Sequence, residues 1–179
     1  MAKAAVFVIK GFEEVEAVTA VDLLRRAGVE TVLVSLGPAK TVEGSHKINI
    51  ETNLLLSDLK PENYDILIIP GGTIDYVNHG EFMKLIGARA EKGQRLAAIC
   101  AAPTVFGRLG ILNGKKAVCY PGFENELKGA DILQDPVVTD GLITTSRGPG
   151  TAPWFALEII RLIVSQEAAD TVKKGLLLA

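Results

Sequence analysis

Cys100 stands where a short apolar run meets the signal for a helix start, and a cysteine in that position can serve as a nucleophile. Leu96–Ile99 is apolar, as buried parallel strands are, and Pro103 suits the first turn of a helix. Free backbone N–H groups and the positive end of the helix dipole favour the thiolate at such an elbow. The alternative is an inert buried residue, which is common for a cysteine with apolar neighbours.

Carboxylates follow the first apolar run of the chain. Glu13, Glu14 and Glu16 come shortly after Ala4–Ile9, and no G-x-G-x-x-G motif is present there, so a bound flavin or nucleotide phosphate is disfavoured. Carboxylates suit proton chemistry beside a nucleophile, although two of the three can be explained as first-turn residues stabilised by the helix dipole. Helical periodicity places Glu14, rather than Glu16, nearer the apolar face.

Strand patterns alternate with helical patterns, which predicts one α/β domain over residues 1–179 with a mostly parallel sheet. Ligands bind beyond the carboxyl ends of the strands in such sheets. The segments expected at that end are Gly11–Glu14, Gly71–Thr73, Cys100–Ala101 and Arg147–Gly150. The other expected elements are helices over 14–27, 75–90 interrupted near His79–Gly80, 103–109, 153–164 and 167–178, strands over 31–35, 65–69 and 117–120, an edge strand or hairpin over 42–51, and a hairpin over 137–146.

The composition is that of a globular protein, with 48% hydrophobic and 22% charged residues. A net charge of -2 and scattered Lys and Arg give no footprint for nucleic acid. Two cysteines do not form a disulfide framework, so we expect a reducing, cytoplasmic location. No apolar run is long enough to predict a signal peptide or a membrane span.

Five segments in this order resemble the ThiJ/PfpI superfamily, in the branch of the parkinsonism-associated deglycase and its bacterial relatives. They are Gly11–Glu16, Val21–Gly28, Ile69–Gly72, Ala97–Pro103 and Thr145–Thr151. The resemblance implies a flavodoxin-like three-layer sandwich and a homodimer. It implies neither a cofactor nor a metal.

The resemblance also implies roles for individual residues. Cys100 corresponds to the reactive cysteine and Glu16 to the pocket glutamate, while Tyr120 stands where many members have a histidine; the two histidines of the chain, His46 and His79, lie elsewhere. The implied oxyanion or substrate-binding residues are Gly71, Gly72, Ala101, Tyr120, Gly148 and Pro149, and Arg26 and Arg147 are expected at the interface or in the pocket wall.

Three functions are compatible with these residues. The first is a cofactor-independent enzyme of the glyoxalase III or deglycase type, which acts on an aldehyde or dicarbonyl substrate such as methylglyoxal through Cys100 and Glu16. The second is a redox-responsive protective or chaperone-like protein in which Cys100 is oxidised. The third and weaker one is a peptidase or amidase, which would lack a histidine to protonate the leaving amine.

Overall fold

The structure of the protein is a computed structural model that describes residues 1–178. Its centre is a seven-stranded sheet with the order β10-β11-β7-β6-β1-β2-β5. Neighbouring strands are parallel except β10 and β11, which form the predicted antiparallel hairpin. The strands are β1 (Lys3–Val8), β2 (Glu30–Ser35), β5 (Leu54–Leu55), β6 (Ile66–Ile69), β7 (Arg95–Ile99), β10 (Val137–Asp140) and β11 (Ile143–Ser146).

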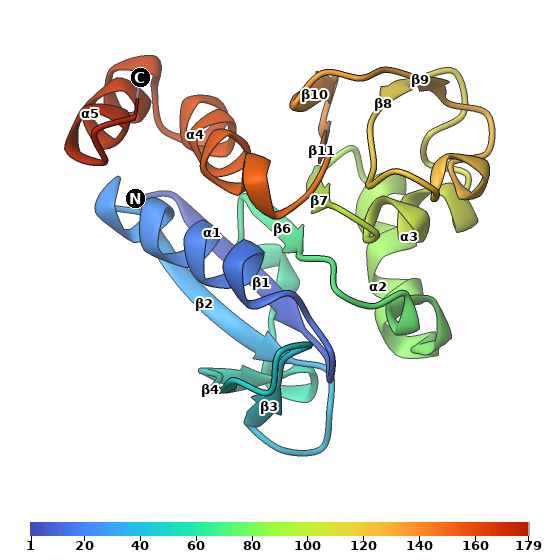
Figure 1. Cartoon of the computed structure of the whole chain (residues 1–179). Helices are drawn as coiled ribbons and strands as arrows, with labels where there is room; N and C mark the ends of the chain where they lie inside the picture. The colour runs from blue at the N-terminus through green and yellow to red at the C-terminus, as the bar shows by residue number, and fades with distance from the viewer. Residues whose placement is uncertain (179) are drawn as a thin grey trace.

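Helices cover both faces of the sheet, which makes the expected three-layer, flavodoxin-like α/β sandwich (Figure 1). α1, α4 and α5 share one apolar core with the sheet, and α2 and α3 share the other. The bounds are α1 (Glu14–Arg26), α2 (Gly80–Glu91), α3 (Pro103–Arg108), α4 (Ala152–Ile163) and α5 (Gln166–Gly175). No helix in residues 1–178 is long and apolar enough to cross a membrane.

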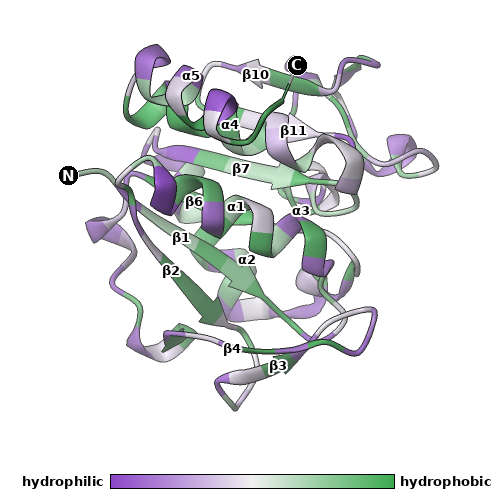
Figure 2. Ribbon diagram, turned by 60° about the vertical axis from the view of Figure 1, so that its left-hand side comes forward, coloured by the Kyte–Doolittle hydropathy of each residue, from purple (hydrophilic) through white to green (hydrophobic). Residues whose placement is uncertain are grey.

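Side chains of β1 alternate between the two cores, and this explains its unbroken apolar sequence. Ala4 and Val6 pack with α1 and α4, whereas Ala5 and Phe7 pack with the opposite core. A strand buried on both faces needs apolar residues at every position. Figure 2 accordingly shows hydrophobic colour along the central strands.

The predicted edge segment over 42–51 is a hairpin, but it does not join the central sheet. β3 (Thr41–Glu43) and β4 (Asn49–Glu51) pair antiparallel in a small sheet of their own. This hairpin is bonded to the loop before α1, because Gly11 N–H donates to the Glu43 carbonyl at 2.8 Å and Ser45 N–H donates to the Phe12 carbonyl at 2.8 Å. It therefore covers the start of α1.

The strand predicted over 117–120 is wrong in extent. β8 (Lys116–Ala117) ends early and pairs with β9 (Asp131–Ile132), outside the central sheet. The backbone beyond it bonds elsewhere: Val118 N–H donates to Thr145 Oγ1 at 3.0 Å and Tyr120 N–H donates to the Cys100 carbonyl at 2.8 Å. Tyr120 consequently lies on a loop that is attached to the cysteine elbow.

The strand order reverses direction next to β1, since β2 lies on one side of it and β6 on the other. Loops that leave the carboxyl ends of strands at such a point diverge and leave room for a site. Gly71 and Cys100 follow β6 and β7 directly, and Glu16 lies in the first turn of α1, which follows the loop after β1. The topology thus brings together three segments that are distant in the sequence.

Candidate active site

Cys100 occupies a sharp elbow between β7 and α3. Its φ of 66° lies in the left-handed region, which is uncommon for a residue with a side chain. The surrounding chain holds this geometry from both sides, because Cys100 N–H donates to the Ser146 carbonyl at 2.9 Å and its own carbonyl accepts from Tyr120 N–H at 2.8 Å. The elbow directs the side chain away from the strand and leaves it 8% exposed.

Glu16 is the buried carboxyl of the site, with no exposed surface. Its Oε2 accepts a 2.6 Å hydrogen bond from Gly71 N–H, and its side chain also interacts with Cys100. Its Oε1 is buried without a hydrogen-bond partner among residues 1–178. Burial raises the pKa of Glu16 to about 7, although the Gly71 N–H opposes the rise. This carboxyl can therefore give or take a proton near neutral pH.

The expectation that the elbow lowers the pKa of Cys100 is wrong. Burial and the neighbouring Glu16 raise the pKa of the Cys100 thiol to about 12, and they outweigh the opposing effect of the backbone N–H groups of Gly72 and Ala101. The helix contributes little because α3 has six residues, so its dipole is small. Cys100 and Glu16 titrate as a pair that keeps one proton above pH 7, and the sulfur is a thiolate whenever that proton lies on the carboxyl.

Gly71 and Gly72 allow the loop after β6 to approach the cysteine. A β-carbon on Gly71 would lie 2.6 Å from the Cys100 Cβ and 3.0 Å from its sulfur. Gly72 has a φ of 89°, and a β-carbon there would collide with the backbone at Glu13. The Gly72 N–H faces the sulfur as expected, but the Gly71 N–H is bound by Glu16. Gly71 is therefore a spacer beside the nucleophile, and its N–H is not free for an oxyanion while Glu16 holds it.

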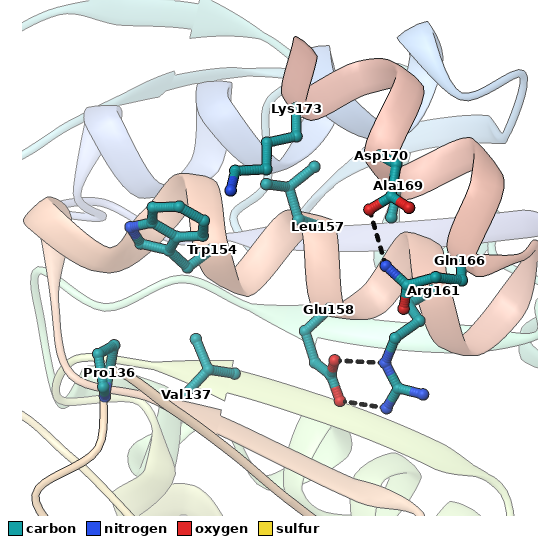
Figure 3. A pocket seen from close by; sticks show the side chains of 10 residues that line it. All are labelled: Pro136, Val137, Trp154, Leu157, Glu158, Arg161, Gln166, Ala169, Asp170 and Lys173. Atoms are coloured by element: carbon teal, nitrogen blue, oxygen red, sulfur yellow. Dashed lines mark hydrogen bonds and ion pairs between the residues drawn. The ribbon is translucent and has the colours of Figure 1, made fainter. Parts of the chain in front are cut away.

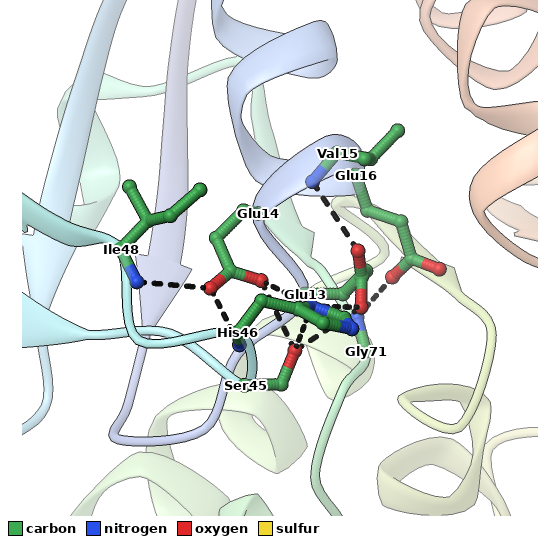
Figure 4. A network of polar contacts seen from close by, with 8 residues as sticks. All are labelled: Glu13, Glu14, Val15, Glu16, Ser45, His46, Ile48 and Gly71. Carbon is green, nitrogen blue, oxygen red and sulfur yellow. Dashed lines mark hydrogen bonds and ion pairs between the residues drawn. The ribbon is translucent and has the colours of Figure 1, made fainter.

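Helical periodicity favoured Glu14 because Val18 was taken as part of the apolar face. Val18 is in fact half exposed, and Glu14 is buried under the β3–β4 hairpin (Figure 4). The Glu14 carboxylate accepts from His46 N–H at 2.7 Å and from Ser45 Oγ at 3.0 Å. Burial opposes ionisation of this carboxyl, but hydrogen bonds from His46, the backbone and Ser45 hold its pKa at about 2. Glu14 is a charged anchor for the hairpin, which does not suit proton transfer near pH 7.

Glu13 connects this network to the site. Its backbone N–H donates to the Gly71 carbonyl at 3.0 Å, and its carboxylate accepts from Ser45 Oγ at 3.2 Å (Figure 4). Two of the three carboxylates were interpreted as first-turn residues. Glu13 is the N-cap of α1 and Glu14 lies in its first turn, and both are in addition buried and bonded to the hairpin. Ligand atoms of Glu13, Glu14 and His46 lie within 4.8 Å of one another, and these groups already bond to each other and to Ser45. Local sequence patterns do not predict this contact between the start of α1 and the β3–β4 hairpin.

Tyr120 is bonded to the cysteine elbow through its N–H, and its ring packs on Gly148. A β-carbon on Gly148 would lie 3.0 Å from the Tyr120 ring, so the ring packs directly on that glycine. Tyr120 is 46% exposed and can face a ligand. Pro149 begins a short 3-10 turn that leads into α4. Neither histidine is beside these residues: His46 binds Glu14, and His79 caps α2 by accepting from Phe82 N–H.

The two arginines are not walls of the cysteine site. Arg26 pairs with Asp22 at 2.7 Å in the last turn of α1. At about 1.5 Å of rise per residue, Glu16 and Arg26 are separated by roughly 15 Å along the helix. Arg147 donates to the Gln134 carbonyl at 3.4 Å. Burial raises the pKa of Cys119 to about 11, and the charge of Arg147 opposes that rise. The structure thus places Arg26 away from the cysteine and Arg147 near Cys119, and a position of both arginines at an interface stays a prediction.

A cavity of about 530 Å³ lies between α4, α5 and β10, away from the cysteine elbow (Figure 3). Trp154 lines it with Lys173, whose ammonium lies 5.0 Å from the ring centre, and the Arg161–Glu158 pair closes it at 2.7 Å. Neither Cys100 nor Glu16 is among its lining residues. Cavity size therefore does not mark the reactive cysteine in this protein.

Fold and site together define a class: α/β sandwiches in which a cysteine at a strand-to-helix elbow adjoins a buried glutamate. The chain belongs to the DJ-1/PfpI family, which it matches over residues 2–162. This confirms the family expected from the motifs. Membership in the family does not by itself assign a reaction to Cys100 and Glu16.

Relatives and solved structures agree over the length of the chain. Protein dj-1beta of Drosophila melanogaster is 36% identical over 185 residues, which covers 100% of this chain and 99% of the relative. The glutathione-independent glyoxalase DJR-1.2 of Caenorhabditis elegans is 32% identical and covers 93% of this chain and 91% of its own. The structure of oxidized Toxoplasma gondii DJ-1 superposes with a TM-score of 0.95 at 33% identity, with full coverage of both chains.

Proposed function

We propose that this protein converts 2-oxoaldehydes such as methylglyoxal into 2-hydroxy acids, without a cofactor, through Cys100 and Glu16. The observation that carries the proposal is the buried Glu16 carboxyl, which interacts with Cys100. Gly71 holds one of its oxygens, and the other has no hydrogen-bond partner among residues 1–178. A positioned carboxyl with a pKa near neutrality is suited to moving a proton between two carbons. The similarity to a glyoxalase of Caenorhabditis elegans supports this class of reaction.

The first step is addition of the Cys100 thiolate to the aldehyde carbon, which forms a C–S bond and a hemithioacetal. The proton shared by Cys100 and Glu16 passes to the new alkoxide, so no charge is left unbalanced. The N–H groups of Gly72 and Ala101, which point to the sulfur in the resting site, are close enough to bind oxygens of the adduct. The ring of Tyr120 bounds the substrate on the side of Gly148.

In the second step Glu16 removes the proton from the former aldehyde carbon and returns it to the former ketone carbon. This isomerisation turns the hemithioacetal into a thioester of the 2-hydroxy acid. Water then cleaves the thioester and releases the acid and the thiol, so that the net reaction is addition of one water to the 2-oxoaldehyde. An early hemithioacetal or aminocarbinol adduct gives the free dicarbonyl when its C–S or C–N bond breaks and the hydroxyl proton passes to the leaving thiol or amine. The released dicarbonyl then follows the same steps, which is the chemistry of deglycation.

The test is lactate formation from methylglyoxal by the wild type, Cys100→Ser and Glu16→Gln. Turnover by the wild type and its loss in both variants would support the proposal. Turnover that persists in Cys100→Ser, with the variant folded, would contradict it. We also propose that the protein is a homodimer, as expected from the family resemblance, and a test follows in the Discussion.

A second function is favoured by the similarity to a DJ-1 structure in an oxidized form. Cys100 oxidised by peroxide to the sulfinate would gain oxygens that can accept a hydrogen bond from protonated Glu16, whose Oε1 is unpartnered. The protein would then respond to oxidation rather than turn over dicarbonyls. Absence of lactate formation, together with selective oxidation of Cys100 by limiting hydrogen peroxide, would favour this function. A peptidase remains the weakest alternative because neither histidine lies at the cysteine.

A further inference from the structure

A small cavity of about 180 Å³ adjoins the segments that carry the site. Ile74, in its wall, lies two residues after Gly72, and Phe123 donates its N–H to the Tyr120 carbonyl at 3.2 Å. Thr104 lies one helical turn after the Cys100 elbow. Three residues of the lining therefore belong to continuations of three site segments. The cavity lies close to the cysteine elbow along the chain, and Cys100 itself is not in its lining.

The lining of this cavity is mostly apolar. Val77 lies in the 3-10 turn Asp75–Asn78, Ile74 directly precedes that turn, and Phe123 lies on the loop after Tyr120. All three present apolar side chains to the cavity. The charged residues in the wall, Arg108 and Glu126, bind each other at 2.9 Å, so they leave no net charge for an ionic ligand. Such a lining suits an uncharged hydrocarbon group.

One polar group in the wall has no partner. Thr104 is 2% exposed, and its Oγ1 is buried without a hydrogen bond among residues 1–178. Buried hydroxyls in native proteins are normally paired, and an unpaired one calls for an explanation such as an absent ligand. Together with the volume, this hydroxyl indicates that the cavity receives part of a bound molecule.

We propose that this cavity is the subsite for the substituent on the ketone carbon of the substrate, and that it selects aryl 2-oxoaldehydes over methylglyoxal. The inference rests on the proposed function. A methyl group would leave most of the 180 Å³ empty, whereas apolar cavities of about 150 Å³ accommodate a benzene ring. In this proposal the substituent on the ketone carbon, which adjoins the carbon bonded to Cys100, fills the cavity, and the Thr104 hydroxyl in the wall donates to the oxygen on that ketone carbon.

The first experiment compares kcat/KM for phenylglyoxal and methylglyoxal. We expect a ratio of at least ~10 in favour of phenylglyoxal, which corresponds to the discrimination that a small hydrophobic pocket achieves. Val77→Phe fills the cavity and should lower the ratio at least ~10-fold. Leu142→Phe, a matched enlargement at an exposed position outside this cavity, should leave the ratio unchanged. Melting curves establish that both variants are folded.

The second experiment does not depend on turnover. Methyl and benzyl methanethiosulfonate each transfer their thioalkyl group to a cysteine thiolate and release methanesulfinate. Normalised to their rates with glutathione, benzyl labelling of Cys100 should exceed methyl labelling in the wild type, and Val77→Phe should abolish the excess. Mass spectrometry assigns the label to Cys100.

The two experiments separate the inference from the proposed function. Absence of turnover with benzyl-selective labelling would overturn the enzyme proposal and retain an aryl subsite beside the cysteine. Turnover without preference for phenylglyoxal, or an equal loss for both substrates in Val77→Phe, would overturn the subsite. Equal labelling by the two reagents in the wild type would overturn it as well.

Discussion

The Gly71 N–H donates a 2.6 Å hydrogen bond to Glu16 Oε2 across 55 residues of sequence. The same glycine accepts a 3.0 Å hydrogen bond at its carbonyl from the N–H of Glu13. The start of α1 and the loop after β6 are thereby joined through both backbone polar groups of one residue, Gly71. With Oε2 occupied, Glu16 has its other oxygen available for Cys100, and the predictions below depend on this arrangement.

We expect Glu16→Gln to lower kcat/KM for 2-oxoaldehydes at least ~100-fold, because the amide cannot move a proton between the two carbons. Tyr120→Phe should cost less than about tenfold, or ~1.4 kcal/mol of barrier, because a phenol is not a base at neutral pH. The prediction is that Glu16→Gln lowers kcat/KM more than Tyr120→Phe does, with lactate formation as the assay. If Tyr120→Phe is as damaging as Glu16→Gln in a folded protein, Glu16 is not the sole acid and base.

Gly71→Ala should abolish alkylation of Cys100 at neutral pH and lower the melting temperature. The new β-carbon would stand 2.6 Å from the Cys100 Cβ and 3.0 Å from the Ala101 nitrogen, so the elbow must move. Gly80→Ala is the matched control, since a β-carbon there meets nothing within 4 Å. Gly80→Ala should keep wild-type reactivity, and normal labelling of Gly71→Ala would show that the loop is not packed as described.

The alkylation rate of Cys100 should follow a titration curve with an apparent pKa near 7. Burial raises the pKa of Glu16 to about 7 and, with Glu16, that of Cys100 to about 12, so the first proton leaves the pair near neutrality. The thiolate fraction of the singly protonated pair then stays constant, and the rate should level off above pH 8. Iodoacetamide rates between pH 5 and pH 9 test this. A logarithmic rise without a plateau would mean that the thiol titrates alone.

Cys100 should react far faster than Cys119 with limiting iodoacetamide at pH 7. Both thiols are buried and both have raised pKa values, but Cys100 has the carboxyl of Glu16 to accept its proton and two N–H donors facing its sulfur. Mass spectrometry of the labelled peptides measures the selectivity. Equal labelling of the two residues would remove the case for a nucleophile at Cys100.

Light scattering at micromolar concentration should give twice the 19.1 kDa mass of the chain. α1 leaves Val15 and Val18 half exposed at positions one turn apart, which is an apolar surface that a second copy could cover. Val18→Glu should shift the mass to that of a monomer, whereas Val164→Glu, at a similarly exposed site after α4, should not. A wild-type mass near 19.1 kDa would contradict the homodimer.

Local patterns were sufficient for most of the fold. The apolar runs at β1, β6 and β7, the helical spacing after Glu14 and the Asp140–Gly141 turn predict elements that the structure contains. Such signals are short-range, because a strand buried on both faces must be apolar and a tight hairpin needs a glycine with positive φ. The position of the cysteine elbow belongs to this group, since a buried strand followed by a proline-started helix predicts it. Its left-handed backbone is held by Ser146 and Tyr120, which are distant in the sequence.

The chemistry of the site depended on contacts between distant segments. Periodicity could not choose Glu16 over Glu14, because the choice is made by Gly71 on one side of α1 and by Ser45 and His46 on the other. The sign of the Cys100 pKa shift was missed for the same reason: local N–H groups favour the thiolate, but burial and the Glu16 charge exceed them. Desolvation and charge proximity are properties of packed side chains in three dimensions, and they decide here which carboxyl holds a proton at pH 7.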